Sequence, residues 1–340
     1  MAGKSSGKKR NYKKATSKGQ TNLEEIAIHP MDWQRRAREE LGETPEIRAK
    51  ALKELEERVR KIENFNPRTD ENFLMRFLRA KKFDVEKAYK SYKKFHTIRL
   101  IDPSRYLPVG VGPLRYKPAF DLATGNQLKP YNPIDGAFVV IWRVGRWSPD
   151  CGFDLSDIFT PTAMGGDFRL REDQAQVAGC HMVLDCGQMQ LSYLRYFPFS
   201  AIRALIMTIQ DGYPSRFKGF HVVNNSSLWD YIWAAARPFL KEKIKGRVFL
   251  HGSDMTSLHK HICPSILPEE YGGQAGPFDW SWITNNLYER NDEFIQLSRY
   301  GFVTNEDKVI ESKQVESGKK GSDFDHSHLI DGDSMQRREG

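Results

Sequence analysis

Long hydrophobic runs are missing from this 340-residue sequence. No uncharged apolar segment approaches the roughly 20 residues that a membrane-spanning helix needs. The opening residues MAGKSSGKKR lack the apolar core of a signal peptide, and residue 2 is alanine where the usual myristoylation signal requires glycine. We therefore expect a cytoplasmic protein whose contact with membranes is peripheral.

Cysteine is also scarce. The chain has four, Cys151, Cys180, Cys186 and Cys263, and no two of them form a CxxC pair. This pattern excludes a disulfide framework of the secreted type and favours reduced, mostly buried thiols.

The motifs of common α/β enzymes are absent. The sequence contains neither a GxSxG nucleophile elbow nor a GxxxxGK[ST] phosphate loop. Gly110-Val111-Gly112 is followed by Pro113 and by no third glycine, which disfavours a dinucleotide site. Asp185 ends a predicted strand without an acid–base partner, so we expect it to cap a neighbouring helix or turn. The sequence therefore predicts a protein that is not an enzyme and uses no cofactor.

A metal site is not indicated either. His251, His259, His261 and Cys263 lie close together in the sequence, but their spacing matches no standard zinc site. We expect these histidines to cap helices or lie at the surface.

Positive charge is present and unevenly distributed. The formal net charge is +8, and residues 1–20 hold seven Lys or Arg and no acidic residue. The rest of the chain is therefore nearly neutral, and the placement of its basic residues matters more than their number. Residues 1–25 are predicted to be a disordered basic tail, and the polar residues 312–340 a second disordered tail.

Residues 26–102 are predicted to form an all-helical module. Helical periodicity extends from about residue 32 to 62, where Thr44 can cap a helix with Pro45 in its first turn. A further helix carries the apolar pairs Phe73-Leu74 and Phe77-Leu78, and Asp84 can cap the one that follows.

Residues 103–275 read as an α/β domain, and residues 276–311 as an extension. Short β-rich runs occupy residues 138–144, 181–184, 219–223 and 247–250, with helical patterns at 199–211 and 228–240. This alternation, with strands that are apolar throughout, predicts a mainly parallel sheet covered by helices on both faces.

The helix at 228–240 is apolar around most of its circumference and carries Trp229 and Trp233. It could be a buried core helix or a lid with one face on a ligand and the other able to enter a membrane interface. Basic residues flank it, namely Arg216, Lys218, Lys241, Lys243, Lys245 and Arg247, and Arg79, Lys81 and Lys82 are expected to extend the patch. The patch could be an ordinary solvated surface or a site for anionic lipid. No nucleic-acid recognition motif accompanies it.

Two stretches resemble the CRAL-TRIO (Sec14-like) family. They are FLMRFLRAKKFDVEKAY and PFLKEKIKGRVFLHG, the latter followed by LHKHICPSILPEEYGG, whose last seven residues, 267–273, are a specific marker. The resemblance implies an N-terminal helical module followed by a CRAL-TRIO domain, in which a mainly parallel sheet and flanking helices form a hydrophobic pocket under a lid helix. The segment at 228–240 matches that lid.

The resemblance also implies site residues. Tocopherol-type pocket positions fall on Phe159, Thr162, Cys180, Leu184, Phe197, Leu205, Thr208, Ile209, Trp229, Ile232 and Trp233. Phosphoinositide-binding positions fall on Lys81, Arg216, Lys218, Lys243 and Arg247, all of them Lys or Arg. Two departures bear on the ligand: Asp185-Cys186-Gly187-Gln188 stands where tocopherol-type relatives have Asp-x-Glu-Gly, and Gly166 replaces a hydroxyl-bearing pocket residue.

The resulting hypothesis is a lipid carrier. It would enclose one tocopherol-, retinoid- or phospholipid-like molecule and exchange it at acidic, phosphoinositide-containing membranes such as endosomes. The alternative is a lipid-sensing or trafficking adaptor that binds lipid without transferring it. We expect no nucleic-acid partner, and the sequence identifies no protein partner.

Overall fold

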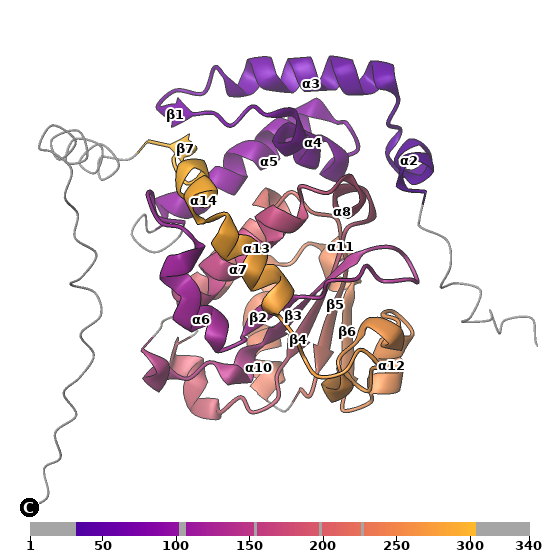
Figure 1. Ribbon diagram of the computed structural model, residues 1–340, viewed down its shortest axis with the longest axis vertical. Helices are drawn as coiled ribbons and strands as arrows, with labels where there is room; N and C mark the ends of the chain where they lie inside the picture. Colours follow the sequence, from indigo (N-terminus) through magenta and orange to yellow (C-terminus); the bar gives the residue numbers. More distant parts are fainter. Residues whose placement is uncertain (1–31, 102–106, 153–154, 197–198, 226–227, 304–340) are drawn as a thin grey trace, which may run out of the picture.

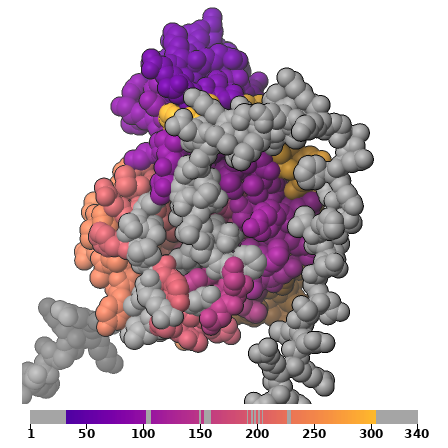
Figure 2. Space-filling model, turned by 90° about the vertical axis from the view of Figure 1, so that its left-hand side faces the viewer, coloured from indigo at the N-terminus to yellow at the C-terminus, as the bar shows by residue number. Residues whose placement is uncertain are grey.

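The computed structural model describes residues 32–101, 107–152, 155–196, 199–225 and 228–303. Both predicted tails lie outside these ranges. No helix among the described residues is long and apolar enough to cross a membrane. In the space-filling view the helical module, in indigo, stands above the magenta to orange elements of the sheet domain (Figure 2).

The N-terminal module consists of α2 (Trp33–Arg36), the π-helical turn η1 (Ala37–Leu41), α3 (Pro45–Val59), α4 (Glu71–Ala80) and α5 (Val85–Thr97). Thr44 and Asp84 cap α3 and α5 as predicted, since their side chains accept hydrogen bonds from the backbone N–H groups three residues later. The periodic stretch from residue 32 is not continuous, because Gly42 adopts a φ of +74° and ends the first helical segment.

The sheet has the order β2-β3-β4-β5-β6. β3 (Phe138–Arg143), β4 (Cys180–Asp185), β5 (Phe217–Val223) and β6 (Val248–Gly252) are parallel, and β2 (Gly125–Gln127) pairs with β3 in the antiparallel direction. The predicted mainly parallel sheet is confirmed. β2 was not predicted, because three residues are too few to show a periodic pattern.

Helices connect and cover these strands. Their bounds are η2 (Ile98–Leu100), η3 (Pro113–Tyr116), α6 (Lys117–Asp121), α7 (Leu155–Arg169), α8 (Asp173–Ala178), α9 (Phe199–Met207), η7 (Thr208–Gly212), α10 (Leu228–Ala236), η8 (Arg237–Phe239), α11 (Glu242–Lys245) and α12 (Met255–His259). The helix predicted at 199–211 finishes as the π-helical turn η7. The one predicted at 228–240 changes to a 3₁₀ turn at residue 237, because Pro238 cannot donate a helical hydrogen bond.

The C-terminal extension returns to the helical module. It contains α13 (Ser281–Glu289), α14 (Asn291–Leu297) and β7 (Gly301–Phe302), which pairs with β1 (Phe65–Asn66) between α3 and α4 (Figure 1). The rings of Phe65 and Phe302 meet edge to face, with centroids 4.9 Å apart.

The two faces of the sheet differ. On one face, Ile141, Val183 and Val223 pack against Leu258 and Tyr271 in a solid core. On the other face, Phe138, Val140 and Cys180 pack against Leu170, which follows α7, and against Ala175 of α8. The rest of this face borders empty space. The candidate site lies on this second face of the sheet.

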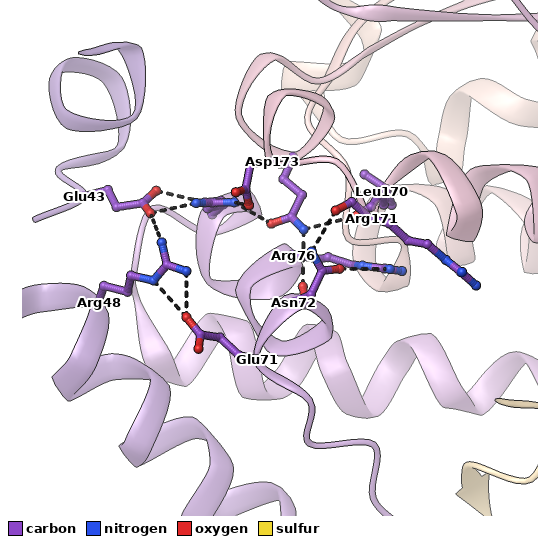
Figure 3. Close-up of polar contacts among 10 residues, drawn as sticks. Glu43, Arg48, Glu71, Asn72, Arg76, Leu170, Arg171 and Asp173 are labelled. Carbon is purple, nitrogen blue, oxygen red and sulfur yellow. Dashed lines mark hydrogen bonds and ion pairs between the residues drawn. The ribbon is translucent and has the colours of Figure 1, made fainter. Parts of the chain in front are cut away.

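A buried polar network joins the helical module to α8 (Figure 3). The Arg79 side chain is 0% exposed, and its guanidinium is paired with both carboxylate oxygens of Glu43, at 2.8 and 2.9 Å, and with Asp173. Gln176 accepts from Arg79 at 2.9 Å and donates to the Leu170 carbonyl. The expectation that Arg79 extends the basic patch is therefore wrong, because a buried guanidinium with two carboxylate partners is not available to a membrane.

Candidate functional site

A large cavity lies between the sheet and the helices α9 and α10, and it holds about 1700 Å³ of empty space, its open mouth included. Its walls are almost entirely apolar. They are formed by Ile98, Ile101, Thr124, Trp142, Val144, Trp147, Phe159, Met182, Leu184, Cys186, Met189, Ile202, Leu205, Ile206, Ile209, Gln210, Phe220, Val222, Trp229, Ile232, Trp233, Ala236, Leu240, Ile244 and Val248. Sites of this composition suit hydrophobic molecules.

The floor of the cavity follows from strand register. Trp142, Leu184 and Val222 are neighbours across β3, β4 and β5. One step along, Met182, Phe220 and Val248 are neighbours across β4, β5 and β6. Successive residues of a strand point to opposite faces, so these alternate positions share one face. Of these residues the sequence analysis predicted only Leu184. The others could have been identified from it, because every second residue of a strand lies on the same face of the sheet.

α10 presents one face to the cavity and the other to solvent. Trp229, Ile232, Trp233 and Ala236 line the cavity, at the spacing of one helix face. Trp229 is 8% exposed, whereas Tyr231 is 63% exposed. This arrangement is that of a cover over a cavity rather than of a helix buried on all sides.

Gln210 of η7 holds the end of this cover. Its side-chain amide donates to the Phe239 carbonyl at 2.9 Å and accepts from the Lys241 backbone N–H at 3.2 Å. The residues that follow α10 are thereby attached to the wall beside it.

The predicted pocket residues divide into three groups. Phe159, Leu184, Leu205, Ile209, Trp229, Ile232 and Trp233 line the large cavity, and Thr208 lines an adjoining one. Phe197 lies outside the described residues. Thr162 and Cys180 line neither cavity.

Cys180 lies instead in a packed cluster with Phe138, Leu170 and Phe217, where it is 1% exposed. Burial raises the pKa of its thiol. Burial likewise raises the pKa of Cys186, which does line the cavity, to about 12. Both thiols are therefore inert hydrophobic groups at neutral pH.

The predicted phosphoinositide positions form one electrostatic cluster. The pKa of Lys243 is lowered by burial and then by the nearby cations Arg247, Lys82 and Arg216. Burial also lowers the pKa of Lys81, which is further influenced by Asp211 and by Lys241 and Lys243. For Lys218, the same lowering of the pKa comes from burial and then from Arg36 and Arg216. Cations that repel one another in this way favour an anionic ligand.

The two arginines of this cluster are partly engaged within the protein. Arg216 pairs with Glu40 at 2.7 Å and also donates to the Val177 carbonyl. Arg247 donates to the Phe217 carbonyl. Within the described ranges, the ammonium groups of Lys81, Lys218 and Lys243 form no ion pair, and Lys243 is the exposed one among them.

The histidines form a hydrogen-bonded chain on the solid face of the sheet. Asp135 contacts His181 at 2.9 Å, His181 contacts His221 at 2.9 Å, and His221 contacts His251 at 3.0 Å. His251 in turn contacts the Ser257 hydroxyl at 2.6 Å. His259 contacts the Tyr271 carbonyl at 2.8 Å, and Cys263 contacts the Ser265 hydroxyl at 3.1 Å. No metal-binding group of three or more such side chains occurs in the described part of the chain.

Comparison with known families defines the class of protein to which this architecture belongs. The family model described as "CRAL/TRIO domain" matches residues 124–273, and the one described as "CRAL/TRIO, N-terminal domain" matches residues 51–94. The chain belongs to the CRAL-TRIO family, as its sequence motifs predicted.

Similar proteins agree with this assignment. "Alpha-tocopherol transfer protein-like" of Homo sapiens is 36% identical over 263 residues, which are 77% of this chain and 75% of that protein. Clavesin-2 of Homo sapiens is 28% identical over 260 residues, 76% of this chain and 79% of that protein. The solved structure titled "Crystal structure of Sfh5" aligns with 85% of this chain and 100% of its own, at 14% identity and a TM-score of 0.42. Family membership and the apolar cavity together support lipid binding in general.

Proposed function

We propose that this protein encloses one hydrophobic lipid in the large cavity and docks on phosphoinositide-containing membranes to exchange it. The observation that carries the proposal is the apolar cavity covered by α10, with Trp229, Ile232 and Trp233 on its inner side. The printed name of the 36% identical relative, "Alpha-tocopherol transfer protein-like", is consistent with such a role.

Enclosing the lipid avoids the free-energy cost of exposing its hydrocarbon to water. Transfer of each CH₂ group into water costs about 0.8 kcal/mol, so a lipid with about 15 such groups faces about 12 kcal/mol. A dry cavity removes most of that cost while the lipid is in transit. Opening α10 against a membrane would let the lipid leave without crossing water.

Exposed aromatic residues suit this contact. On the solvent side of α10 Tyr231 is 63% exposed, and Phe199 at the start of α9 is 57% exposed. The Phe199 ring meets that of Phe239 with centroids 4.9 Å apart, and Lys241 follows two residues later. Aromatic rings at the interface beside lysines are typical of peripheral membrane contact. Each lysine near an acidic leaflet contributes about 1 kcal/mol.

The test removes two of the three lysines that form no ion pair and retains the cavity. We expect Lys81→Ala with Lys243→Ala to reduce binding to phosphoinositide vesicles by about tenfold or more and to slow lipid transfer between vesicles. Lipid binding in the absence of vesicles should stay unchanged, because neither side chain lines the cavity. The matched control is Lys50→Ala with Lys53→Ala, which removes the same charge from exposed positions on α3.

Three outcomes separate the candidate functions. Equal effects of the two double variants would contradict a localised membrane site. A protein that binds lipid and vesicles but moves no lipid between them would be a sensing or trafficking adaptor. Failure of the wild-type protein to bind any lipid would contradict the whole proposal.

A further inference from the structure

A chain of three histidines crosses the solid face of the sheet, and its residues line neither cavity. His181 of β4, His221 of β5 and His251 of β6 are linked ring to ring, and Asp135 and Ser257 of α12 contact the two ends at 2.9 and 2.6 Å (Figure 1). The three histidines are 5%, 0% and 8% exposed. The histidine chain is therefore separated from water along most of its length.

The direction of these hydrogen bonds follows from the Asp135 end. Burial raises the pKa of Asp135, but the hydrogen bond from His181 outweighs it, so the pKa is lowered overall and the carboxylate is ionised. A carboxylate can only accept, so His181 donates from Nε2 and, as a neutral ring, accepts at Nδ1. The same pattern repeats at His221 and His251, and the Ser257 hydroxyl donates to the last ring. Every ring nitrogen of the neutral histidine chain is thus used, with all protons directed toward Asp135.

The histidine chain can take up one proton without losing a hydrogen bond. Oγ of Ser257 also lies 2.8 Å from the Asp254 carbonyl, to which the hydroxyl can turn. Nδ1 of His251 can then bind a proton and donate it to Oγ. Transfer of one proton across each of the two ring-to-ring contacts reverses both of them and leaves the charge on His181. A second proton on the rings would place two N–H groups against each other, so the capacity is one proton.

The surroundings favour this position of the charge. Burial, and then the neighbouring histidines, lower the pKa of His221 to about 2, and burial likewise lowers the pKa of His251 and of His261. A cation on His181, in contrast, lies 2.9 Å from the Asp135 carboxylate. Further charged or titratable groups that face the histidine chain are Lys218 of β5, Asp254 and Lys260 at the two ends of α12, and His261 beyond it.

The Asp135 end of the histidine chain adjoins the basic cluster. The Asp135 carbonyl accepts a hydrogen bond from Arg36, which also pairs with Glu40. Glu40 pairs in turn with Arg216 at 2.7 Å. Burial, and then Arg36 and Arg216, lower the pKa of Lys218, whereas the charges of Glu40 and Asp135 act in the opposite direction. Asp135 therefore offsets part of the positive charge of the cluster.

We propose that the histidine chain is a proton-operated switch for membrane docking. When it takes up one proton, His181 becomes a cation beside Asp135, and the pair carries no net charge. Asp135 then offsets less of the positive charge of the basic cluster, which binds an acidic membrane more tightly. This inference rests on the proposed function and adds regulation by pH to it, with tighter docking in more acidic surroundings.

The test uses vesicles whose own charge does not change with pH. Phosphatidylglycerol has a phosphodiester head that stays ionised from about pH 7.5 to about pH 5.5, the range in which histidine titrates. We expect the wild-type protein to bind these vesicles about two- to fivefold more tightly at the lower pH, the effect of about one charge near the site. His181→Gln keeps a neutral donor for Asp135 and should hold the affinity at the higher-pH value throughout. Asp135→Asn removes the carboxylate and should bind at both pH values as tightly as the acidified wild type.

His259→Gln is the matched control, because His259 contacts the Tyr271 carbonyl outside the histidine chain and its loss should leave the pH response unchanged. A pH response that persists in His181→Gln, or that is lost equally in His259→Gln, would overturn the role of the histidine chain. Equal vesicle binding by the wild-type protein at both pH values would overturn the switch and leave the proposed function intact. Failure of the wild-type protein to bind acidic vesicles at either pH would contradict the proposed docking itself.

A measurement on the wild-type protein does not depend on the folding of any variant. Ring nitrogen shifts of ¹⁵N-labelled histidine should show one ring of the histidine chain becoming doubly protonated as the pH falls. Inositol hexakisphosphate, a soluble anion, should move that titration to higher pH, because the coupling between proton and anion is reciprocal. A histidine chain that stays neutral throughout, or whose titration does not respond to the anion, would contradict the switch.

Discussion

The Tyr271 hydroxyl donates a 2.9 Å hydrogen bond to Oδ2 of Asp185, across 86 residues of sequence. The other oxygen of Asp185 accepts from the Gly187 backbone N–H and from the Asn224 amide, both at 2.9 Å. Asp185 therefore caps the turn after β4, as predicted, and ties it to β5 and to the LPEEYGG marker. The carboxylate is fully used in holding three segments together.

Removing the Tyr271 hydroxyl should destabilise the protein without affecting the cavity. The bond to a carboxylate is charge-assisted, so we expect Tyr271→Phe to lower the free energy of unfolding by about 1.5–3 kcal/mol. Tyr271 is 0% exposed and packs on the solid face of the sheet, away from the cavity. Urea unfolding measures the change, and Tyr288→Phe is a control, because the buried Tyr288 hydroxyl has no partner among the described residues. Equal decreases in the free energy of unfolding of the two variants would show that the hydrogen bond to Asp185 does not stabilise the protein.

Two aromatic residues of α10 should have separable roles. Trp233 lines the cavity, whereas Tyr231, two residues earlier, faces solvent. We expect Trp233→Ala to weaken lipid binding about tenfold, because it removes buried apolar contact area. Tyr231→Ala should leave lipid binding unchanged and reduce binding to vesicles a few-fold. Ligand titration and vesicle sedimentation measure the two effects, and reversed effects would contradict the assigned orientation of α10.

Glu40 should limit the affinity of the basic cluster for anions. It pairs with Arg216 at 2.7 Å, and hydrogen bonds from Arg216 and Arg36 lower its pKa although burial opposes them. We expect Glu40→Gln to raise affinity for phosphoinositide vesicles about two- to fivefold, because it removes the carboxylate that pairs with Arg216 and also with Arg36. The control Glu39→Gln removes the same charge from a 67% exposed side chain one position earlier. Equal gains would indicate a general charge effect instead of release of Arg216.

The buried histidines should make stability depend on pH. Burial, and then the neighbouring His181, His261 and His251, lower the pKa of His221 to about 2. Below about pH 6.5 the unfolded chain binds a proton that the folded chain cannot, so stability is complete above that pH and falls as the pH decreases toward 2.

The loss approaches about 1.4 kcal/mol per pH unit for each such group. We therefore expect His221→Gln to reduce the slope of unfolding free energy against pH by up to that amount. Denaturant unfolding between pH 5 and 6.5 measures the slope before carboxylates contribute. A slope equal to that of the wild type would show that His221 titrates normally.

Local sequence signals were sufficient to predict the helices of the N-terminal module and the four parallel strands, although not β2 or the helices α7 and α8. Thr44 and Asp84 cap helices because a side-chain oxygen three residues before an unpaired N–H satisfies it regardless of the rest of the chain. Strands β3 to β6 were predicted because doubly covered strands are continuously apolar. In contrast, the helical periodicity from about residue 32 to 62 did not reveal that the first helical segment ends at Gly42. A periodic pattern of apolar residues contains no information on the backbone φ angle.

The candidate site was only partly predictable, because its walls come from distant segments. Ile98 of the helical module lines the large cavity through tertiary packing alone. Arg79 and Lys81 are two residues apart and both basic, yet one is buried between two carboxylates and the other contributes to the surface cluster. The spacing of basic residues along a helix does not show which of them will contact carboxylates from other segments of the folded chain.

The sequence by itself determined the family and the order of the parallel strands β3 to β6 with the helices before them, because these depend on motifs and on periodicity within a segment. Through the family resemblance it also indicated which segment covers the cavity. Only the tertiary structure decided that His181, His221 and His251, which belong to three different strands, form one hydrogen-bonded chain. The first and last of these residues are 70 positions apart in the sequence. A chain of this kind depends on the register in which β4, β5 and β6 pair, and no local pattern encodes that register.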